Sequence, residues 1–283
     1  MNANAIEVKS LSKSYGSTIA LNDVSLTVER GEVFGLLGPD GAGKTTLFHI
    51  LTTLMLPDSG EASICGFNCA SDMWEIRRRV GYMPGRFSLY PDLSVKENLQ
   101  FFASLFGVDM NTNYSMIEPI YCRLKPFENR PAGKLSGGMK QKLALSCALI
   151  HRPEILLLDE PTTGVDAVSR REFWDLLDDI KRTGITVLVS TPYMDEAARC
   201  DRIALMNGGR IMDKGTLREL LTHFRGDLYA VKSVTPYSTL MQLRSTPGIN
   251  SAYLFGQSIH VSATTPPPDS ERIEPGIEDL FIQ

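Results

Sequence analysis

The feature that most constrains this sequence is a short glycine-rich run between an apolar segment and an amphipathic one. The run is Gly38-Pro39-Asp40-Gly41-Ala42-Gly43-Lys44-Thr45, which fits the pattern G-x-x-x-x-G-K-[ST]. Residues 33–37 before it are apolar throughout, which is typical of a strand buried on both faces of a parallel sheet. After it, Leu47, Ile50 and Leu51 recur at helical spacing. The order of strand, glycine-rich turn and helix predicts a phosphate-binding loop.

Each residue type in this loop suits phosphate binding. The glycines let backbone N–H groups turn inward around phosphate oxygens, and the N-terminus of the following helix adds its positive dipole end. Lys44 is expected to reach the β- and γ-phosphates, the Thr45 hydroxyl to ligate Mg²⁺, and Thr46 to complete the loop. A glycine-rich turn with a chance Lys-Thr pair is the competing interpretation, and the flanking strand and helix disfavour it.

A second apolar segment, residues 155–158, ends in the adjacent carboxylates Asp159 and Glu160. Ligands bind at the carboxyl ends of the strands in parallel sheets, so these carboxylates are expected to complete a nucleotide site. Asp159 suits the metal ion, and Glu160 suits the orientation of an attacking water. As a general base Glu160 would contribute about 10²- to 10⁴-fold in rate. A strand that ends in a solvated acidic turn is the alternative.

The segment Leu135-Ser136-Gly137-Gly138-Met139-Lys140-Gln141 opens another expected helix. A serine followed by two glycines leaves free N–H groups and little steric bulk, which predicts a second anion site at Ser136, Gly137 and Gly138. From the residues alone, an ordinary N-cap followed by glycines is an equally good interpretation.

The remaining pattern predicts an α/β fold. Alternating residues at 6–8 and 24–28 indicate antiparallel strands, and apolar segments at 155–158 and 185–189 flank a helix with one apolar face. Residues 72–135 read mainly as helix. We expect a P-loop NTPase core with an antiparallel β subdomain and an inserted α-helical subdomain over residues 1–220, closed by a hairpin at 202–214. Residues 221–283 are expected to form a small α+β appendage that contains a linker-like run at 264–270.

Composition excludes several classes of protein. The chain has 29 Lys and Arg against 33 Asp and Glu, a net charge of −4, which disfavours nucleic acid as the main partner. Apolar runs such as ITVLV are far shorter than the roughly 20 residues of a membrane-spanning helix. The N-terminus MNANAIEVKS lacks the pattern of a secretory signal, so a cytoplasmic location is expected. The five cysteines are expected to be reduced and largely packed thiols.

Taken together, GPDGAGKTT, LSGGMKQ, ILLLDEP and TTGVD resemble the nucleotide-binding subunit of ATP-binding cassette (ABC) transporters over about residues 6–221. The resemblance implies an ATPase that uses ATP and Mg²⁺. It also implies that two cassettes meet head to tail, with the Ser136-Gly137-Gly138 turn of one closing over ATP held by the other. Tyr15 would stack on adenine, and Asp166 would lie in a loop between the two sites. By itself, Tyr15 is a half-exposed strand aromatic.

Within the family, the segments GYMPGRFSLYPDLSVKENLQFFA and STPYMDEAARCDRIALM look most like cassettes of multisubunit exporters, including those for drugs or small cations. The chain resembles the N-terminal cassette of tandem-cassette exporter ATPases. This implies an integral-membrane partner subunit, a second cassette as homodimer, heterodimer or tandem half, and a place on the inner face of the cell membrane. Residues 87–106 would dock on the membrane subunit.

Two positions depart from the family pattern. Gly85 stands where such cassettes have a glutamine after a strand that ends in Tyr-x-Pro. Pro192 stands where they have a histidine that contacts the γ-phosphate. Proline offers no donor, and losing one such donor typically costs about 10²- to 10³-fold in turnover. We therefore expect ATP binding with slow hydrolysis. The alternatives are a fully active enzyme compensated by Ser190, Thr191 or Tyr193, a non-hydrolysing regulatory module, and a cassette protein that acts on ribosomes or DNA.

Overall fold

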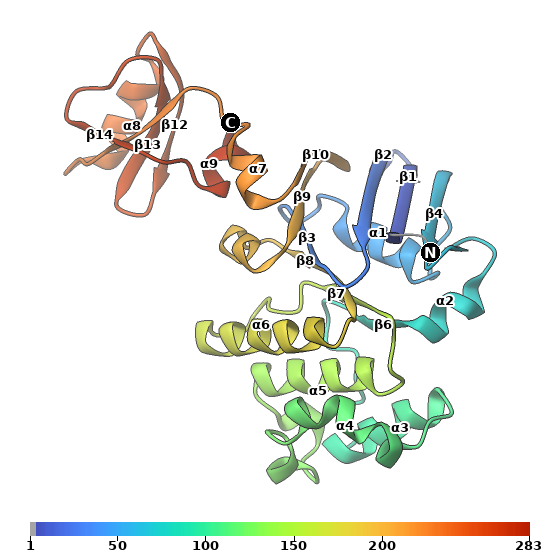
Figure 1. The fold of residues 1–283 in the computed structure, drawn as a ribbon. Coiled ribbons are helices and arrows are strands. Elements are labelled where there is room, and N and C mark those ends of the chain that lie inside the picture. The colour runs from blue at the N-terminus through green and yellow to red at the C-terminus, as the bar shows by residue number, and fades with distance from the viewer. Residues whose placement is uncertain (1–3) are drawn as a thin grey trace. The chain divides into compact units, whose positions relative to one another are not determined.

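The computed structural model describes residues 4–283, with residues 111 and 112 described by their backbone alone. The expectation for the N-terminus rests partly on residues 1–3, which lie outside the described residues. The chain divides into two compact units, Met1–Lys214 and Gly215–Gln283. Each unit is built around its own sheets and helices (Figure 1). The second unit begins at Gly215, whereas the sequence pattern placed the change of character near 220.

A parallel sheet forms the centre of the first unit. Its strand order is β10-β9-β3-β8-β7-β6. The strands are β3 (Val33–Leu37), β6 (Val80–Met83), β7 (Ile155–Asp159), β8 (Thr186–Thr191), β9 (Arg202–Asn207) and β10 (Arg210–Gly215). Strand β3 pairs in parallel with β8 and β9, and β7 pairs in parallel with β6 and β8. Every residue of β3, β7 and β8 is buried, which confirms the parallel-strand prediction for the apolar runs.

An antiparallel sheet of order β2-β1-β4-β5 lies beside the parallel one. Its strands are β1 (Asn4–Tyr15), β2 (Thr18–Glu29), β4 (Ser59–Ile64) and β5 (Phe67–Asn68). Helix α1 (Lys44–Leu51) buries Leu47, Phe48, Ile50 and Leu51 in a core that also holds residues of both sheets. The phosphate loop that precedes α1 is therefore fixed at its C-terminal end by a helix packed on two sheets.

A second core joins the other face of the parallel sheet to the helices α3 to α6, which Figure 1 shows on the side away from β1 and β2. The helices of the first unit after α1 are α2 (Met73–Arg79), α3 (Val95–Leu105), α4 (Met110–Tyr121), α5 (Gly137–Leu149) and α6 (Ala167–Arg182), with short 3₁₀ turns at η1 (Lys125–Phe127), η2 (Ala132–Lys134) and η3 (Met194–Arg199). Helix α3 begins with a reciprocal capping box, because Ser94 Oγ accepts from Glu97 N at 3.2 Å and Ser94 N donates to Glu97 Oε2 at 2.7 Å.

The prediction that residues 72–135 are mainly helical is wrong at one place. Residues Val80–Met83 form β6 and pair with β7 in the central sheet. The inserted helices therefore follow Met83, and α2 is a separate short helix that leads into a core strand.

The second unit is a small α+β structure with sheet order β12-β13-β11-β14. It consists of α7 (Leu217–Leu221), β11 (Asp227–Val231), α8 (Pro236–Arg244), β12 (Ile249–Phe255), β13 (Ser258–Ala263), β14 (Ser270–Ile273) and α9 (Ile277–Ile282). Leu240 and Leu243 of α8 pack on one face of the sheet against Val231, Ile259 and Val261. The linker-like run at 264–270 is a loop inside this unit, because it joins two strands of the same sheet.

Two further expectations concern the chain as a whole. Among residues 4–283, no helix combines the length and the apolar character needed to cross a bilayer. The cysteines are free thiols, and Cys122 is the exposed one among them, so the expectation of packing is wrong at that position.

Candidate nucleotide-binding site

The phosphate loop depends on its glycines at three positions. A Cβ atom on Gly38 would clash with the carbonyl oxygen of Met206, and one on Gly43 would clash with that of Ala20. Gly41 and Gly43 also have backbone φ angles of +79° and +105°, which residues other than glycine rarely adopt. The loop is therefore pressed against neighbouring backbone, while its tip at Pro39 and Asp40 is exposed and Ala42 is buried beneath it.

The side chain of Lys44 folds back onto the start of this loop. Its side chain is only 3% exposed, and its Nζ donates to the carbonyl oxygens of Gly38 at 2.8 Å and Pro39 at 3.0 Å. The same nitrogen lies 3.1 Å from Oε1 of Glu160. Thr45 is exposed in the first turn of α1, and Thr46 is buried behind it. In the described part of the chain no hydrogen bond engages the Thr45 hydroxyl, so the loop offers a ligand this hydroxyl and the Lys44 ammonium.

The carboxylates at the end of β7 are held by the neighbouring strand β8. Asp159 is 3% exposed, and its Oδ1 accepts a hydrogen bond from Ser190 Oγ at 2.6 Å. The backbone N of Glu160 donates to Ser190 Oγ at 2.9 Å and to its carbonyl at 3.1 Å. Glu160 has φ +50°, a left-handed conformation that costs about 1–2 kcal/mol and persists because these bonds enforce it. Thr163 Oγ1 donates to Glu160 Oε2 at 3.3 Å.

The donor set fits both expected ligands. Mg²⁺ prefers oxygen ligands and keeps several waters, so the Thr45 hydroxyl and the Asp159 carboxylate are suitable groups to hold it. Lys44 and the loop amides suit phosphate oxygens. Glu160 adjoins Lys44, where a base for an attacking water is needed.

Tyr15 and Asp166 occupy positions with their own local contacts. Tyr15 ends β1 with 47% of its surface exposed, and its hydroxyl contacts Met55 Sδ at 3.1 Å. Asp166 caps α6, since its Oδ1 accepts from the backbone N atoms of Val168 and Ser169 at 3.1 and 3.0 Å. The bonds from Ser169 hold the pKa of the Asp166 carboxyl below its usual value. Both residues remain accessible to a ligand or a second chain.

Ser136 caps α5 by accepting a hydrogen bond from Met139 N at 3.4 Å. A Cβ atom on Gly138 would lie 2.6 Å from Ser169 Oγ, so the start of α5 packs closely on the start of α6. Within residues 4–283, no hydrogen bond or ion pair joins Ser136, Gly137 or Gly138 to the phosphate loop. A single copy of the chain therefore leaves this turn unused by its own Lys44.

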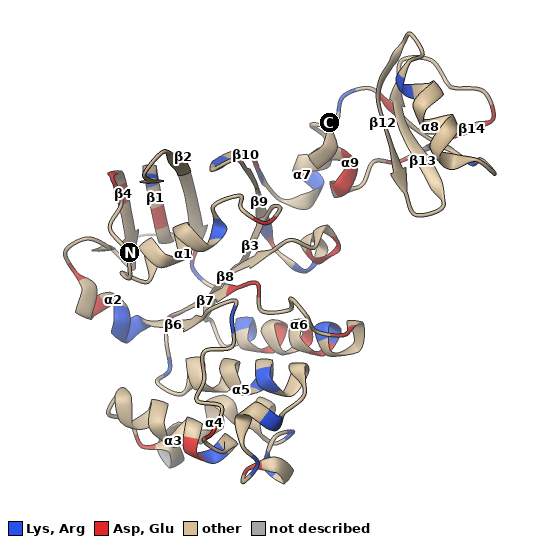
Figure 2. Ribbon diagram, turned by 180° about the vertical axis from the view of Figure 1, so that it is seen from behind, with Lys and Arg blue, Asp and Glu red and all other residues tan. Residues whose placement is uncertain are grey.

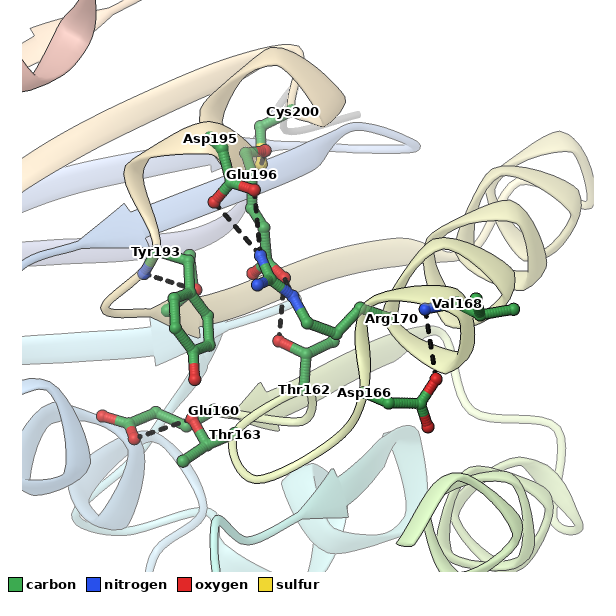
Figure 3. Close-up of polar contacts among 11 residues, drawn as sticks. Glu160, Thr162, Thr163, Asp166, Val168, Arg170, Tyr193, Asp195, Glu196 and Cys200 are labelled. Atoms are coloured by element: carbon green, nitrogen blue, oxygen red, sulfur yellow. Dashed lines mark hydrogen bonds and ion pairs between the residues drawn. The ribbon is translucent and has the colours of Figure 1, made fainter. Parts of the chain in front are cut away.

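Sequence reasoning missed a polar network behind Glu160 (Figure 3). Arg170 of α6 pairs with Asp195 and Glu196 of η3, and Thr162 Oγ1 donates to Glu196 Oε1 at 2.9 Å. The Arg170 guanidinium also lies 4.0 Å from the centroid of the Tyr193 ring. The one available signal was position, because these residues follow the carboxyl ends of β7 and β8.

Comparison with known proteins identifies the family. A family model described as ABC transporter matches residues 21–163, about half of the chain, and spans the phosphate loop, the Ser136 turn and both carboxylates. The chain belongs to the ABC transporter family. It is an ATP-binding domain and an ATPase of the ABC type, and the P-loop fold expected from the sequence is confirmed.

Relatives of this ABC domain include export proteins. The probable multidrug ABC transporter ATP-binding protein YbhF of Escherichia coli K12 is 42% identical over 225 residues, which cover 78% of this chain and 39% of YbhF. The chain thus spans about two fifths of the length of that relative. The Nod factor export ATP-binding protein I of Burkholderia orbicola is 34% identical over 298 residues, covering 100% of this chain and 97% of the relative.

Solved structures of ABC subunits share the fold. An ATP-binding subunit of an ABC transporter superimposes with a TM-score of 0.71 and 31% identity, covering 78% of this chain and 93% of that one. The dimeric cassette MJ0796 bound to ADP and Pi superimposes with a TM-score of 0.68 and 27% identity, covering 75% and 99%. ABC ATP-binding subunits dimerise and work with membrane subunits.

Proposed function

We propose that this chain is the ATP-binding subunit of an exporter. It binds MgATP between its own phosphate loop and the Ser136-Gly137-Gly138 turn of a second cassette, and it drives transport through a separate membrane subunit. The observation that carries this proposal is the convergence of Lys44, Asp159 and Glu160 at the carboxyl ends of β3 and β7. A buried ammonium 3.1 Å from a candidate base suits triphosphate chemistry.

The proposed site hydrolyses ATP slowly. Pro192 follows β8 directly and supplies neither a side-chain nor a backbone donor to developing phosphate charge. Gly85 supplies no side-chain oxygen ligand for Mg²⁺, and a Cβ atom there would lie 3.1 Å from the carbonyl oxygen of Asp159. Glu160 and the loop around Lys44 are present, so nucleotide binding is retained better than turnover.

The second cassette is proposed to be a different one, as a heterodimer or a tandem half. A homodimer would place two slow sites in one assembly. In a mixed dimer, the Ser136 turn of this chain completes an ATP site on the partner cassette that hydrolyses ATP at a normal rate. Hydrolysis at that second site supports transport. The relatives named as multidrug and Nod factor exporters favour export as the direction.

A groove between the central sheet and the inserted helices is the proposed seat of the membrane subunit. Its volume is about 630 Å³. Apolar side chains line most of it, among them Leu54, Trp74, Met83, Leu89, Phe102 and Leu105. Trp74 and Leu105 are 66% and 63% exposed. A short amphipathic segment of the membrane subunit suits such a groove, and its binding would hold the chain at the inner face of the membrane.

Charge does not favour nucleic acid as a partner. Basic and acidic residues are interspersed along α6 (Figure 2), and the whole chain carries a net charge of −4. A phosphate backbone requires a contiguous basic surface. Membrane protein and second cassette are therefore the proposed macromolecular partners.

Steady-state ATPase measurements on the chain and its Pro192→His variant test the proposal. We expect slow turnover in the unaltered chain and a gain of tenfold or more with histidine, because one donor near the γ-phosphate is typically worth about 10²- to 10³-fold. A rate typical of active cassettes that histidine leaves unchanged would contradict the slow-site proposal. Binding of labelled ATP without formation of any ADP would instead indicate a purely regulatory module.

A further inference from the structure

The residue after Pro192 is anchored beside the phosphate loop. The backbone N of Gly38, the first residue of the loop, donates to the carbonyl oxygen of Thr191 at 3.3 Å. The backbone N of Tyr193 donates to Thr191 Oγ1 at 3.0 Å. The segment Thr191-Pro192-Tyr193 is therefore tied to the loop at one end and closed into a local turn at the other.

Arg170 fixes the ring of Tyr193. Its guanidinium lies 4.0 Å from the ring centroid and is itself held by Asp195 at 3.0 Å and by Glu196 at 3.2 Å. Glu196 is only 3% exposed and accepts a further hydrogen bond from Thr162. A cation that is held by two carboxylates and lies against an aromatic face keeps that ring in one orientation.

That orientation aims the hydroxyl of Tyr193 toward the turn of Glu160 and Thr163 (Figure 3). Both oxygens of the Glu160 carboxylate are engaged, one by Lys44 at 3.1 Å and the other by Thr163 at 3.3 Å. In the described part of the chain, the Tyr193 hydroxyl has no hydrogen-bond partner. The hydroxyl thus faces the side of the molecule where the ammonium of Lys44 and the carboxylate of Glu160 meet.

We propose that the Tyr193 hydroxyl donates a hydrogen bond to the terminal phosphate of ATP, and so supplies from the next residue the donor that Pro192 lacks. The inference rests on the proposed function, because it requires triphosphate beside Lys44. A phenol hydroxyl carries one donor and adds no charge. Arg170 is a positioning residue, since it acts on the phosphate only through the Tyr193 ring. Tyr193 thereby favours ATP over ADP and supports the slow turnover that remains.

Binding measurements on Tyr193→Phe test this assignment apart from activity. Affinities for MgATP and MgADP are measured by calorimetry in a Glu160→Gln background, in which ATP is preserved. Phenylalanine keeps the ring on Arg170 and removes only the hydroxyl. A hydrogen bond to a charged group typically raises affinity tenfold or more. We therefore expect the affinity of Tyr193→Phe for ATP to fall about tenfold and its affinity for ADP to stay the same. Tyr237→Phe, an exposed tyrosine of α8, is the matched control.

A rescue experiment sharpens the test. Pro192→His added to Tyr193→Phe is expected to restore the preference for ATP over ADP, because histidine provides a donor at the neighbouring position. Equal weakening of ATP and ADP by Tyr193→Phe, or no change in either, would overturn the role of Tyr193 while leaving the proposed function intact. Failure of the Glu160→Gln chain itself to bind ATP would overturn the proposed function.

Discussion

The ammonium of Lys44 lies 3.1 Å from Oε1 of Glu160, although the two residues are 116 positions apart and follow different strands. Lys44 begins α1 after β3, and Glu160 directly follows β7. Strand β8 lies between β3 and β7 and bonds to the C-terminal end of each. Its Thr191 carbonyl accepts a hydrogen bond from Gly38 N after β3, and its Ser190 Oγ donates one to Asp159 Oδ1 of β7. The parallel sheet therefore brings the phosphate-binding cation and the candidate base together.

Replacing Glu160 is expected to separate binding from hydrolysis. Glu160→Gln removes the base but keeps the shape of the side chain, so turnover should fall by about 10²- to 10⁴-fold while ATP affinity is retained. Steady-state ATPase rates and equilibrium binding check this. Glu154→Gln, at the exposed position just before β7, is the control and should leave both quantities unchanged. Turnover that survives intact in Glu160→Gln would exclude Glu160 as the base.

The phosphate loop is expected to tolerate no side chain at Gly38. An added Cβ would meet the backbone oxygen of Met206, which cannot yield as a flexible side chain would. Gly38→Ala should lower the free energy of unfolding by about 1–3 kcal/mol and weaken ATP binding at least tenfold. Gly107→Ala is the control, because an added Cβ there would face open space; its φ of +65° costs some stability but should leave ATP affinity unchanged. Thermal unfolding and ATP titration distinguish the two, and normal ATP affinity in Gly38→Ala would contradict the close packing of the loop.

His151 is expected to make the first unit sensitive to acid. Burial lowers the pKa of this histidine to about 4. Its Nε2 donates to the Val80 carbonyl, and its ring stacks on that of Phe106 with 3.8 Å between the ring centroids. The unfolded chain, in which this histidine has a pKa near its ordinary value, binds a proton at a higher pH than the folded chain does. Stability contributed by the neutral ring is therefore complete above about pH 6.5 and is lost as the pH falls toward 4, up to about 3 kcal/mol.

Chemical denaturation between pH 7 and pH 4.5 measures this effect. His151→Gln should flatten the dependence of unfolding free energy on pH, even if it changes the value at pH 7. An identical slope in His151→Gln and the unaltered chain would rule out a neutral buried His151.

Asp279 is expected to hold α9 to the sheet of the second unit. Its Oδ1 accepts hydrogen bonds from the Tyr253 hydroxyl and from His260 Nδ1, and its Oδ2 accepts from Gly276 N at 2.6 Å. Asp279→Ala leaves two buried donors without an acceptor, which should cost about 3 kcal/mol in the stability of this unit. Hydrogen exchange in β12 and β13 measures the loss. The exposed Glu274→Ala is the control, and equal exchange in both variants would contradict the anchoring role.

The parts of the fold that the sequence predicted are those with strong local patterns. Residues 33–37 and 155–158 contain no polar side chain, and residues 185–189 contain only Thr186, because both faces of the sheet are covered. The glycine-rich loop lies between a strand and a helix. The local pattern did not indicate strand β6, which only the family resemblance implied, because Val80-Gly81-Tyr82-Met83 is too short to show a period and its partner β7 lies more than 70 positions away. Pairing with a strand so distant in the sequence produces no pattern in the residues of β6 themselves.

The candidate site divides in the same way. Lys44, Asp159 and Glu160 stand in recognisable patterns, so their convergence could be expected. Arg170 gave no signal beyond its position after β7, because its partners Tyr193, Asp195 and Glu196 come from a different segment and contact it only in the folded chain. Contacts of this kind depend on tertiary structure and are invisible to spacing rules.

Calorimetric titration of the chain with ATP in the presence of Mg²⁺, repeated with Lys44→Ala, measures whether the phosphate loop around Lys44 binds ATP. We expect saturable uptake of one ATP per chain, and loss of that uptake when Lys44 is replaced. Absence of uptake by the unaltered chain, or uptake of equal affinity by Lys44→Ala, would contradict this expectation.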